Sequence, residues 1–308
     1  MTEEQHRNTL LDAELPFVER KGINPALFAF LCLGSVFLLY QVGGGILTFL
    51  FIGVGKVTRE NVGLVRVFTM VGQVFLILLP TLLLARLLSR KQSEVFPLRM
   101  PTWKESVAAT IGLISLQRVF EVYVYFQDQI ALPEFLRKLI EPVRQMMEEL
   151  VKMLVRSESV PEFIFVVMVV AVVPSIAEEY LFRGLIQKSF NRVMNPLLSV
   201  LLSGTIFGLF HLNPFETVPL IAIGCFLGFL RYRSNSIALP VLVHFLNNFL
   251  AVIAVTMDLG NEKTMMAPRT DQPGLLLAVT QLVLFLGLFL VTMRVYVLTT
   301  NPVDRRSL

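Results

Sequence analysis

The chain has 308 residues, of which 55% are hydrophobic and only 16% are charged, and its formal net charge is +4. Ordinary soluble domains are about 45–50% apolar and about 25% charged, so this composition excludes a soluble globular protein. The small positive charge is typical of loop lysines and arginines that orient a membrane protein, and it argues against a nucleic-acid-binding surface. The apolar runs are continuous rather than alternating, which disfavours an outer-membrane barrel.

The N-terminal tail, residues 1–22, is polar and has no signal-peptide pattern, so we expect the first membrane helix to be retained. Most of the apolar runs that follow approach or exceed the roughly 20 helical residues that cross a bilayer. We predict an all-α, polytopic integral membrane bundle of about eight transmembrane helices. Their expected ranges are 26–52, 65–88, 106–126, 161–190, 196–211, 217–232, 236–257 and 273–297.

The segment 134–156 differs from these apolar runs. Its apolar side chains share one helical face and its charged side chains occupy the other faces. This pattern predicts an amphipathic helix that lies on the membrane or packs against the bundle, either closing the domain or gating substrate. The expected organisation is a tail (1–22), N-terminal transmembrane helices with the amphipathic helix (23–158), a core (159–258), and a last transmembrane helix with a short tail (259–308).

The distribution of lysine and arginine predicts the orientation of the bundle. If the N-terminus is cytoplasmic, 16 of the 27 cationic residues lie on the inner side, 10 lie on the outer side and Arg118 lies within a segment. The bias predicts that both termini are cytoplasmic. With straight, full-length helices, however, Glu178 falls towards the inner side and His211 towards the outer side. Either one helix is offset in depth or one predicted boundary is wrong.

Ionisable side chains concentrate in three apolar stretches, "AEEYLFRG" (177–184), "TIFGLFHLNP" (205–214) and "LPVLVHFLNNFL" (239–250). A charge in hydrocarbon costs several kcal/mol unless it is paired or hydrated, so these residues are candidates for function. Cys32 and Cys225 lie in apolar runs without zinc or disulfide spacing, and we interpret them as buried apolar residues.

Helical spacing separates the two carboxylates of the first stretch. Glu179 and Arg183 are four residues apart, so they share a face and can form an internal ion pair. Glu178 points about 100° away from Glu179, which leaves it free for chemistry.

The two histidines complete the candidate site. His244 and Asn248 are four residues apart and can face one cavity, while Phe207 can pack beside the ring of His211. We expect Glu178, His211, His244 and Asn248 to converge. A carboxylate and an imidazole can activate water, and a second histidine with an amide can stabilise an oxyanion, which favours peptide hydrolysis without a covalent intermediate.

Two other interpretations of the same residues stay open. Glu178, His211 and His244 are also a possible zinc ligand set, although the helical HExxH spacing is absent. A polar network that only joins helices is the third interpretation.

Three short motifs carry a family resemblance. "EEYLFRG", "FGLFH" and "HFLNN" correspond to EExxxR, FxxxH and HxxxN, and over about residues 160–255 the chain resembles the CAAX-protease and bacteriocin-processing (CPBP, Rce1-like or Abi) family of intramembrane proteases. The resemblance implies an eight-helix membrane endopeptidase without a tightly bound metal. The implied roles are water activation by Glu178 with His211, an oxyanion site of His244 and Asn248, and support from Glu179 and Arg183.

The sequence therefore predicts an integral membrane endopeptidase, placed in a bacterial inner membrane, that acts on a membrane protein or peptide. No cofactor, no nucleic-acid partner and no particular oligomeric state is predicted. Two other classes of function compete with this prediction. One is a non-catalytic immunity or scaffold protein on the same fold, and the other is a transporter with a proton relay, for which no inverted repeat stands out.

Overall fold

The computed structural model describes residues 15–53, 57–257 and 274–300. Throughout these residues the regular elements are helices, and six of the helices are long and apolar enough to cross a membrane. They are Pro25–Ile52, made of α3 (Pro25–Phe37), η1 (Leu38–Gly44) and α4 (Gly45–Ile52); Val62–Leu88, made of α5 (Val62–Gly72), η2 (Gln73–Leu78) and α6 (Leu79–Leu88); α8 (Trp103–Asp128); Val160–Asn191, made of α10 (Val160–Val167), η3 (Met168–Val172), α11 (Val173–Glu179), η4 (Tyr180–Ile186) and α12 (Gln187–Asn191); α15 (Ala238–Thr256); and α16 (Leu275–Thr299). The predicted fold class, a helical integral membrane bundle, is confirmed.

The other two predicted segments are the shorter α13 (Pro196–Phe210, 15 residues) and α14 (Thr217–Ser234, 18 residues). At a rise of 1.5 Å per residue, α13 falls short of a hydrocarbon core about 30 Å thick. The predicted count of eight transmembrane helices is therefore approximate.

Glycines bring α13 and α14 into close contact. A Cβ atom on Gly204 would lie 2.5 Å from the backbone nitrogen of Cys225, and one on Gly224 would lie 2.6 Å from the carbonyl oxygen of Gly204. Small residues allow this close approach of helix backbones, which is a common way of packing helices in a membrane. The hairpin of α13 and α14 is thus a single tight unit that carries His211 at its turn.

Within the described residues, four π-helical segments interrupt three of the long helices. η1 contacts η2, and η2, η3 and η4 each contact α11, which ends in the glutamate pair. A π segment shifts the hydrogen-bond register of a helix by one residue, and such segments frequently mark functional sites. η3 and η4 flank α11 within the same long helix, and η2 packs against it from the neighbouring helix, so three of these segments border the glutamate pair.

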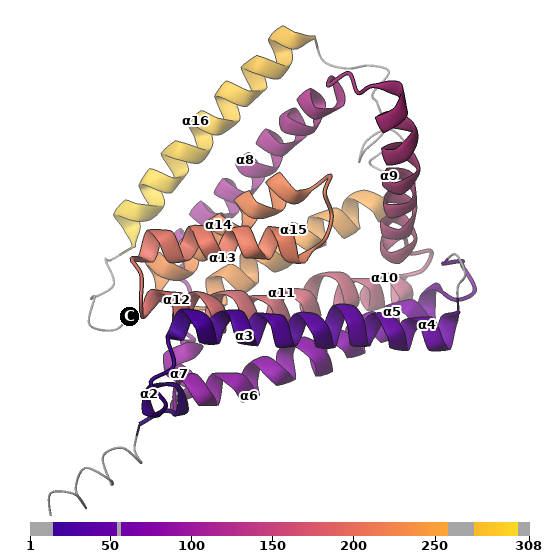
Figure 1. The fold of residues 1–308 in the computed structure, drawn as a ribbon. Helices are drawn as coiled ribbons and strands as arrows, with labels where there is room; N and C mark the ends of the chain where they lie inside the picture. Colours follow the sequence, from indigo (N-terminus) through magenta and orange to yellow (C-terminus); the bar gives the residue numbers. More distant parts are fainter. Residues whose placement is uncertain (1–14, 54–56, 258–273, 301–308) are drawn as a thin grey trace, which may run out of the picture.

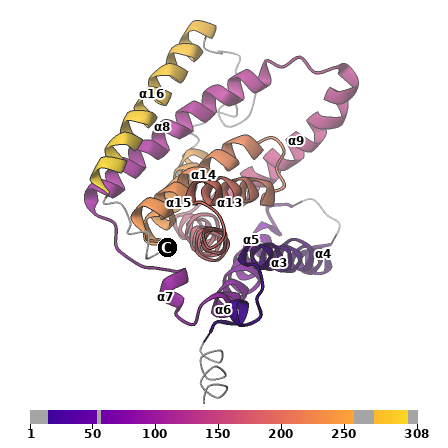
Figure 2. The ribbon, with the colours of Figure 1, turned by 60° about the vertical axis from the view of Figure 1, so that its left-hand side comes forward.

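The amphipathic segment forms the helix α9 (Glu134–Val155), close to its predicted bounds. Figures 1 and 2 show α9 crossing one end of the bundle, between the far end of α8 and the start of α10. In Figure 1 its axis runs across those of α3 and α6, which is the attitude of a helix on the membrane surface. Part of its apolar face, including Phe135, Leu139 and Met146, is exposed on the protein surface.

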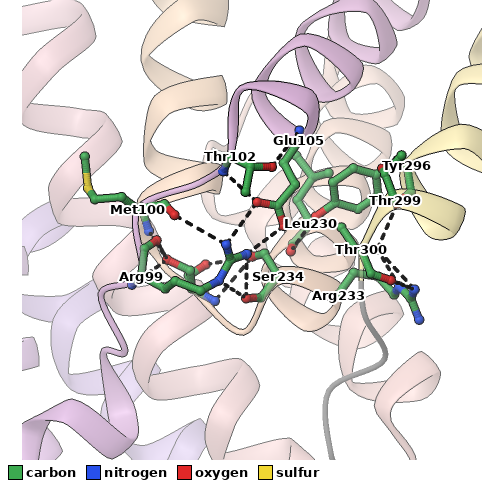
Figure 3. Close-up of polar contacts among 12 residues, drawn as sticks. Arg99, Met100, Thr102, Glu105, Leu230, Arg233, Ser234, Tyr296, Thr299 and Thr300 are labelled. Atoms are coloured by element: carbon green, nitrogen blue, oxygen red, sulfur yellow. Dashed lines mark hydrogen bonds and ion pairs between the residues drawn. The ribbon is translucent and has the colours of Figure 1, made fainter.

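A hydrogen-bonded cluster, here called the end cluster, closes the opposite end of α8 (Figure 3). Thr102 and Glu105 form a capping box at the start of α8. Arg99 donates to both carboxylate oxygens of Glu105, at 2.6 and 3.0 Å, and to the carbonyl of Ser234, the last residue of α14. Ser236 donates its hydroxyl to the carbonyl of Arg99. The end cluster therefore fixes α8 to the turn between α14 and α15.

Other polar contacts fasten the remaining ends of the chain. Arg233 donates to the carbonyls of Val297 and Thr300 at the end of α16, at 2.8 and 2.9 Å (Figure 3). In the predicted N-terminal tail, the short helix α2 (Phe17–Arg20) carries Glu19, which pairs with Arg192 at 2.7 Å. The rest of that tail (1–14), the connection 258–273 and the C-terminal tail (301–308) lie outside the described residues.

Candidate active site

The depth of the site follows from the short length of α13. Glu178 lies near the middle of the long helix Val160–Asn191, and α13 runs back beside this helix for only 15 residues before it ends at His211. About as many residues separate Glu178 from the turn before α13. Because α13 is too short to cross the whole bilayer, its end at His211 lies at the same depth in the membrane as Glu178. This explains why full-length helices predicted different depths for these two residues.

Three of the four predicted catalytic residues come together. Oε2 of Glu178 lies 3.7 Å from Nε2 of His211 and 4.0 Å from Nε2 of His244. The side chain of Glu178 is 14% exposed, that of His211 30% and that of His244 5%. The carboxylate is thus largely shielded from solvent, with two imidazole nitrogens directed at the same oxygen.

The ring of His211 is oriented by the helix end on which it lies. His211 is the C-cap of α13, and its Nδ1 lies 2.8 Å from the carbonyl oxygen of Phe207, one of the carbonyls that have no partner within a helix at its C-terminus. A carbonyl only accepts, so Nδ1 carries the hydrogen and Nε2 is the atom that faces Glu178. Leu212 then takes a positive φ of 53°, and the helix stops there.

Glu179 and Arg183 form the expected ion pair, with 2.7 Å between Oε1 and Nη1 and both side chains fully buried. The sequence did not predict that the same Oε1 also accepts a hydrogen bond from Nδ1 of His244, at 2.9 Å. Glu179 therefore holds both a guanidinium and an imidazole. This arrangement fixes the ring of His244 so that its Nε2 faces Glu178.

Arg183 connects this pair to the α13–α14 hairpin. Its Nη2 donates to the carbonyl of Gly224 at 3.0 Å, and its guanidinium carbon lies 4.4 Å from the centre of the Phe207 ring, a cation–π contact. The same ring lies 4.7 Å from the ring of His211 and 5.8 Å from that of His244. Phe207 therefore packs against both imidazoles, and not only against that of His211 as predicted.

Asn248 does not join the other three residues by a hydrogen bond in the described part of the chain. Its Nδ2 donates to the carbonyl of Val170 in η3 at 3.1 Å, and its Oδ1 accepts from Nδ2 of Asn247 at 3.1 Å. Asn247 in turn accepts from Gln117 on α8. The π segment supplies the carbonyl that holds Asn248, which the spacing of residues could not show.

Polar residues of the N-terminal half, which were not predicted as site residues, also approach the site. Tyr40 in η1 lies close enough to Glu178 to interact with it electrostatically, and it is next to Gln73 in η2. Gln41 donates from Nε2 to the carbonyl of Phe210, next to His211, at 3.1 Å. The signal that would have found them is an isolated polar side chain inside an apolar run.

Several buried polar atoms of the site have no hydrogen-bond partner among the described residues. They include Oε2 of Glu178, Oε2 of Glu179 and Nε of Arg183. Buried polar groups in native proteins are nearly always paired, so such an atom at a candidate site indicates a place for a substrate or a water molecule.

The residues do not fit a metal site in this arrangement. Within the part of the chain that the structure describes, no group of three or more histidine, cysteine, aspartate or glutamate side chains has the geometry to hold a metal ion. The zinc alternative predicted for Glu178, His211 and His244 therefore has no geometric support here.

Comparison with protein families gives one match. Residues 160–250 match the family described as type II CAAX prenyl endopeptidase Rce1-like. The matched stretch runs from the start of α10 into α15 and includes all seven residues named as catalytic or supporting. Searches of curated proteins and of solved structures found no significant match. The chain is thus an integral membrane protein that carries an Rce1-like domain, from a family of membrane-embedded proteases, over less than a third of its length.

Proposed function

Starting from this Rce1-like domain, we propose that the chain is an intramembrane endopeptidase that hydrolyses a peptide bond of a membrane-associated protein or peptide, with water as the nucleophile. The observation that carries the proposal is the position of Oε2 of Glu178, without a hydrogen-bond partner among the described residues and directed at Nε2 of both His211 and His244. On the charge bias of the loops we propose that both termini are cytoplasmic, and we expect the membrane to be a bacterial inner membrane.

The tautomer of His211 supports Glu178 and His211 as the pair that activates water. Since Nδ1 donates to the Phe207 carbonyl, the neutral ring offers only a lone pair at Nε2, and the ionised Glu178 carboxylate also only accepts. Two acceptors 3.7 Å apart cannot bond directly, but one water molecule between them can donate a hydrogen to each. As the water oxygen attacks the scissile carbonyl carbon, Glu178 takes its proton and later passes it to the leaving amine.

The bond between Glu179 and His244 supports His244 as the donor to the oxyanion. Because Nδ1 of His244 is committed to Glu179, Nε2 can donate only when the ring is an imidazolium. In that form the ring presents an N–H to the developing oxyanion, next to the carboxylate of Glu178.

Asn248 is the second proposed oxyanion donor. Its amide nitrogen is held by the Val170 carbonyl, so it acts only after exchanging this bond for one to substrate. Hydrogen bonds at catalytic sites often reach their productive geometry only when substrate binds. This makes η3, the segment that holds Asn248, the part of the site expected to move.

The proposal is tested by comparing the membrane proteomes of cells with the wild-type protein and with Glu178→Gln. New peptide termini that appear only with the wild type identify a substrate and support hydrolysis. A non-catalytic immunity or scaffold protein would produce the same cellular effect with both versions, and a proton relay would change ion or proton flux without creating new termini. Elemental analysis of the active purified protein decides the zinc alternative, which requires stoichiometric zinc whose removal and return switch activity off and on.

A further inference from the structure

The C-terminal end of α9 is held by a buried arginine from another helix. Arg66 on α5 is 2% exposed and donates to the carbonyls of Met153, Leu154 and Arg156, at distances between 2.5 and 2.9 Å. It also binds Glu162 on α10 at 2.6 Å. Arg66 therefore satisfies carbonyls of the last turn of α9 that have no partner within the helix. In doing so it joins α9, α5 and α10 at one point.

A cavity of about 350 Å³ adjoins this junction, with charged side chains from α9, α5 and α10 in its wall. Most of these charges are already paired. Arg66 binds Glu162, whose second carboxylate oxygen accepts from the backbone N–H of Glu158, and the side chain of Glu158 pairs with Arg59 at 2.8 Å. These contacts account for two of the cations and two of the carboxylates in the wall.

Three charged side chains at the C-terminal end of α9 are left over, two from the helix and one from its C-cap residue. Lys152, Arg156 and Glu149 line the cavity, and no ion pair or side-chain hydrogen bond joins them to the described part of the chain. Cations in the last turn of a helix ordinarily interact with its terminal carbonyls, but here Arg66 occupies these carbonyls. Two positive charges and one negative charge leave a net charge of +1, which one phosphodiester would neutralise.

The location of the cavity indicates where such a phosphodiester comes from. The wall includes Val62 and Glu162, which lie at the starts of the membrane-spanning helices Val62–Leu88 and Val160–Asn191. The ends of such helices lie at the level of the lipid headgroups. α9 crosses the bundle at the same end (Figure 1). Its exposed apolar residues include Leu139 and Met146, as in a helix that lies on a membrane surface.

We propose that this cavity binds the phosphate of an anionic phospholipid headgroup, with Lys152 and Arg156 as its ligands and Glu149 accepting a hydrogen bond from a headgroup hydroxyl. The bound lipid fastens the C-terminal end of α9 to the membrane. Lys152 also lines a smaller cavity with Asn213, Phe215 and Glu216, which follow His211 in the chain. The lipid site therefore lies on the same helix that packs beside the His211 turn.

The test measures binding of phosphatidylglycerol to the detergent-purified full chain by native mass spectrometry, and the thermal shift that this lipid causes. Lys152→Gln/Arg156→Gln is compared with Arg137→Gln/Lys138→Gln, which removes the same charge from exposed positions of the same helix, where both cations are near Glu134. We expect the cavity variant to bind the lipid about tenfold or more weakly, because each cation near an anionic headgroup contributes substantially to binding, while the control variant binds nearly as well as the wild type. Lys152→Gln alone replaces the double variant if that protein is not recovered.

Inorganic phosphate and phosphatidylcholine distinguish the source and the class of ligand. The proposal requires that phosphatidylglycerol binds with its acyl chains intact, that phosphatidylcholine binds more weakly, and that millimolar phosphate only competes. Equal lipid binding by the cavity variant and the control variant would overturn the proposal. Tight binding of phosphate without any preference for phosphatidylglycerol would overturn its lipid part and leave a phosphate site. If phosphatidylglycerol is displaced by a peptide with a free carboxylate but not by phosphate, the cavity is a peptide site and the lipid proposal is wrong.

Discussion

Two groups in different parts of this bundle each pair an arginine with a buried glutamate, and their hydrogen bonding differs. In the end cluster, Glu105 accepts two bonds from Arg99 and one from the backbone N–H of Thr102 (Figure 3). At the candidate site, Oε1 of Glu179 is bound by both Arg183 and His244, while Oε2 of Glu179 and Oε2 of its neighbour Glu178 have no hydrogen-bond partner among the described residues. A carboxylate whose bonds are satisfied locks helices together, whereas one left unsatisfied beside two imidazoles is available to bind a proton or a water molecule.

The largest effect is expected where the carboxylate is unsatisfied. Glu178→Gln keeps the size of the side chain but removes the group that accepts the proton, so we expect peptidase activity to fall about 10²–10⁴-fold. Melting behaviour and yield in detergent should match the wild type, because no hydrogen bond within the described protein is lost at Oε2. Glu141→Gln, on the surface of α9, is the matched control and should keep full activity. An active Glu178→Gln enzyme would contradict the role of Glu178 and most of the proposed mechanism.

The next effect is on folding and concerns the adjacent glutamate. Glu179→Ala leaves Arg183 and His244 without their buried partner, and removing one member of a buried ion pair typically costs about 3–5 kcal/mol. We expect poor recovery and a clearly lower melting temperature, measured by thermal unfolding in detergent. A Glu179→Ala protein that is recovered and melts like the wild type would show that the pair is not structural, and the contrast with Glu178 would fail.

The end cluster should respond in the same direction as Glu179, but less strongly. Glu105→Ala removes hydrogen bonds to a charged group, each worth about 1.5–3 kcal/mol, but the Arg99 side chain is 45% exposed and regains water in return. We therefore expect a loss of about 1–2 kcal/mol in the free energy of unfolding, with unchanged activity for each folded molecule. A loss of activity greater than the loss of folded protein would indicate that the end cluster influences the site.

The sequence predicted well those features that depend on neighbouring residues along the chain. Long apolar runs located the membrane helices, and the four-residue spacing of Glu179 and Arg183 predicted a pair that the structure contains. It failed where geometry depends on packing. The depth conflict arose because the helices were taken as straight and full length, although the predicted range 196–211 is close to the bounds of α13. The hydrogen bond that Asn248 donates to the Val170 carbonyl of η3 was not predicted.

Residues of the N-terminal half were missed for a related reason. Tyr40 and Gln73 approach the site only because the π segments η1 and η2 pack against each other and η2 packs against α11. No periodic pattern marks a π segment, since it shifts the hydrogen-bond register by one residue inside a run that is apolar throughout. The bond of Glu179 to His244 joins residues 65 positions apart, and local spacing carries no information about it.

The smallest expected effect concerns a third carboxylate, which is intermediate between the satisfied and the unsatisfied ones. Glu216 lies in the turn between His211 and α14, and burial raises its pKa above the ordinary value of 4.5, with His211 opposing the shift and Glu148 adding to it. Because the folded protein holds the proton more tightly than the unfolded chain, the stabilisation is fully present below about pH 4.5 and is lost as the pH rises through the raised pKa.

Glu216→Gln keeps the neutral form at every pH, so its unfolding free energy minus that of the wild type should increase from pH 4.5 upwards and then level off. Thermal unfolding of both proteins from pH 4.5 upwards measures this difference in unfolding free energy. The titratable groups that both proteins share contribute equally to each, so their effect cancels. If the difference does not change with pH, or if the wild type is the more stable protein at neutral pH, the folded protein accommodates the ionised form of Glu216 without a cost. Glu216 would then resemble the hydrogen-bonded Glu105 of the end cluster.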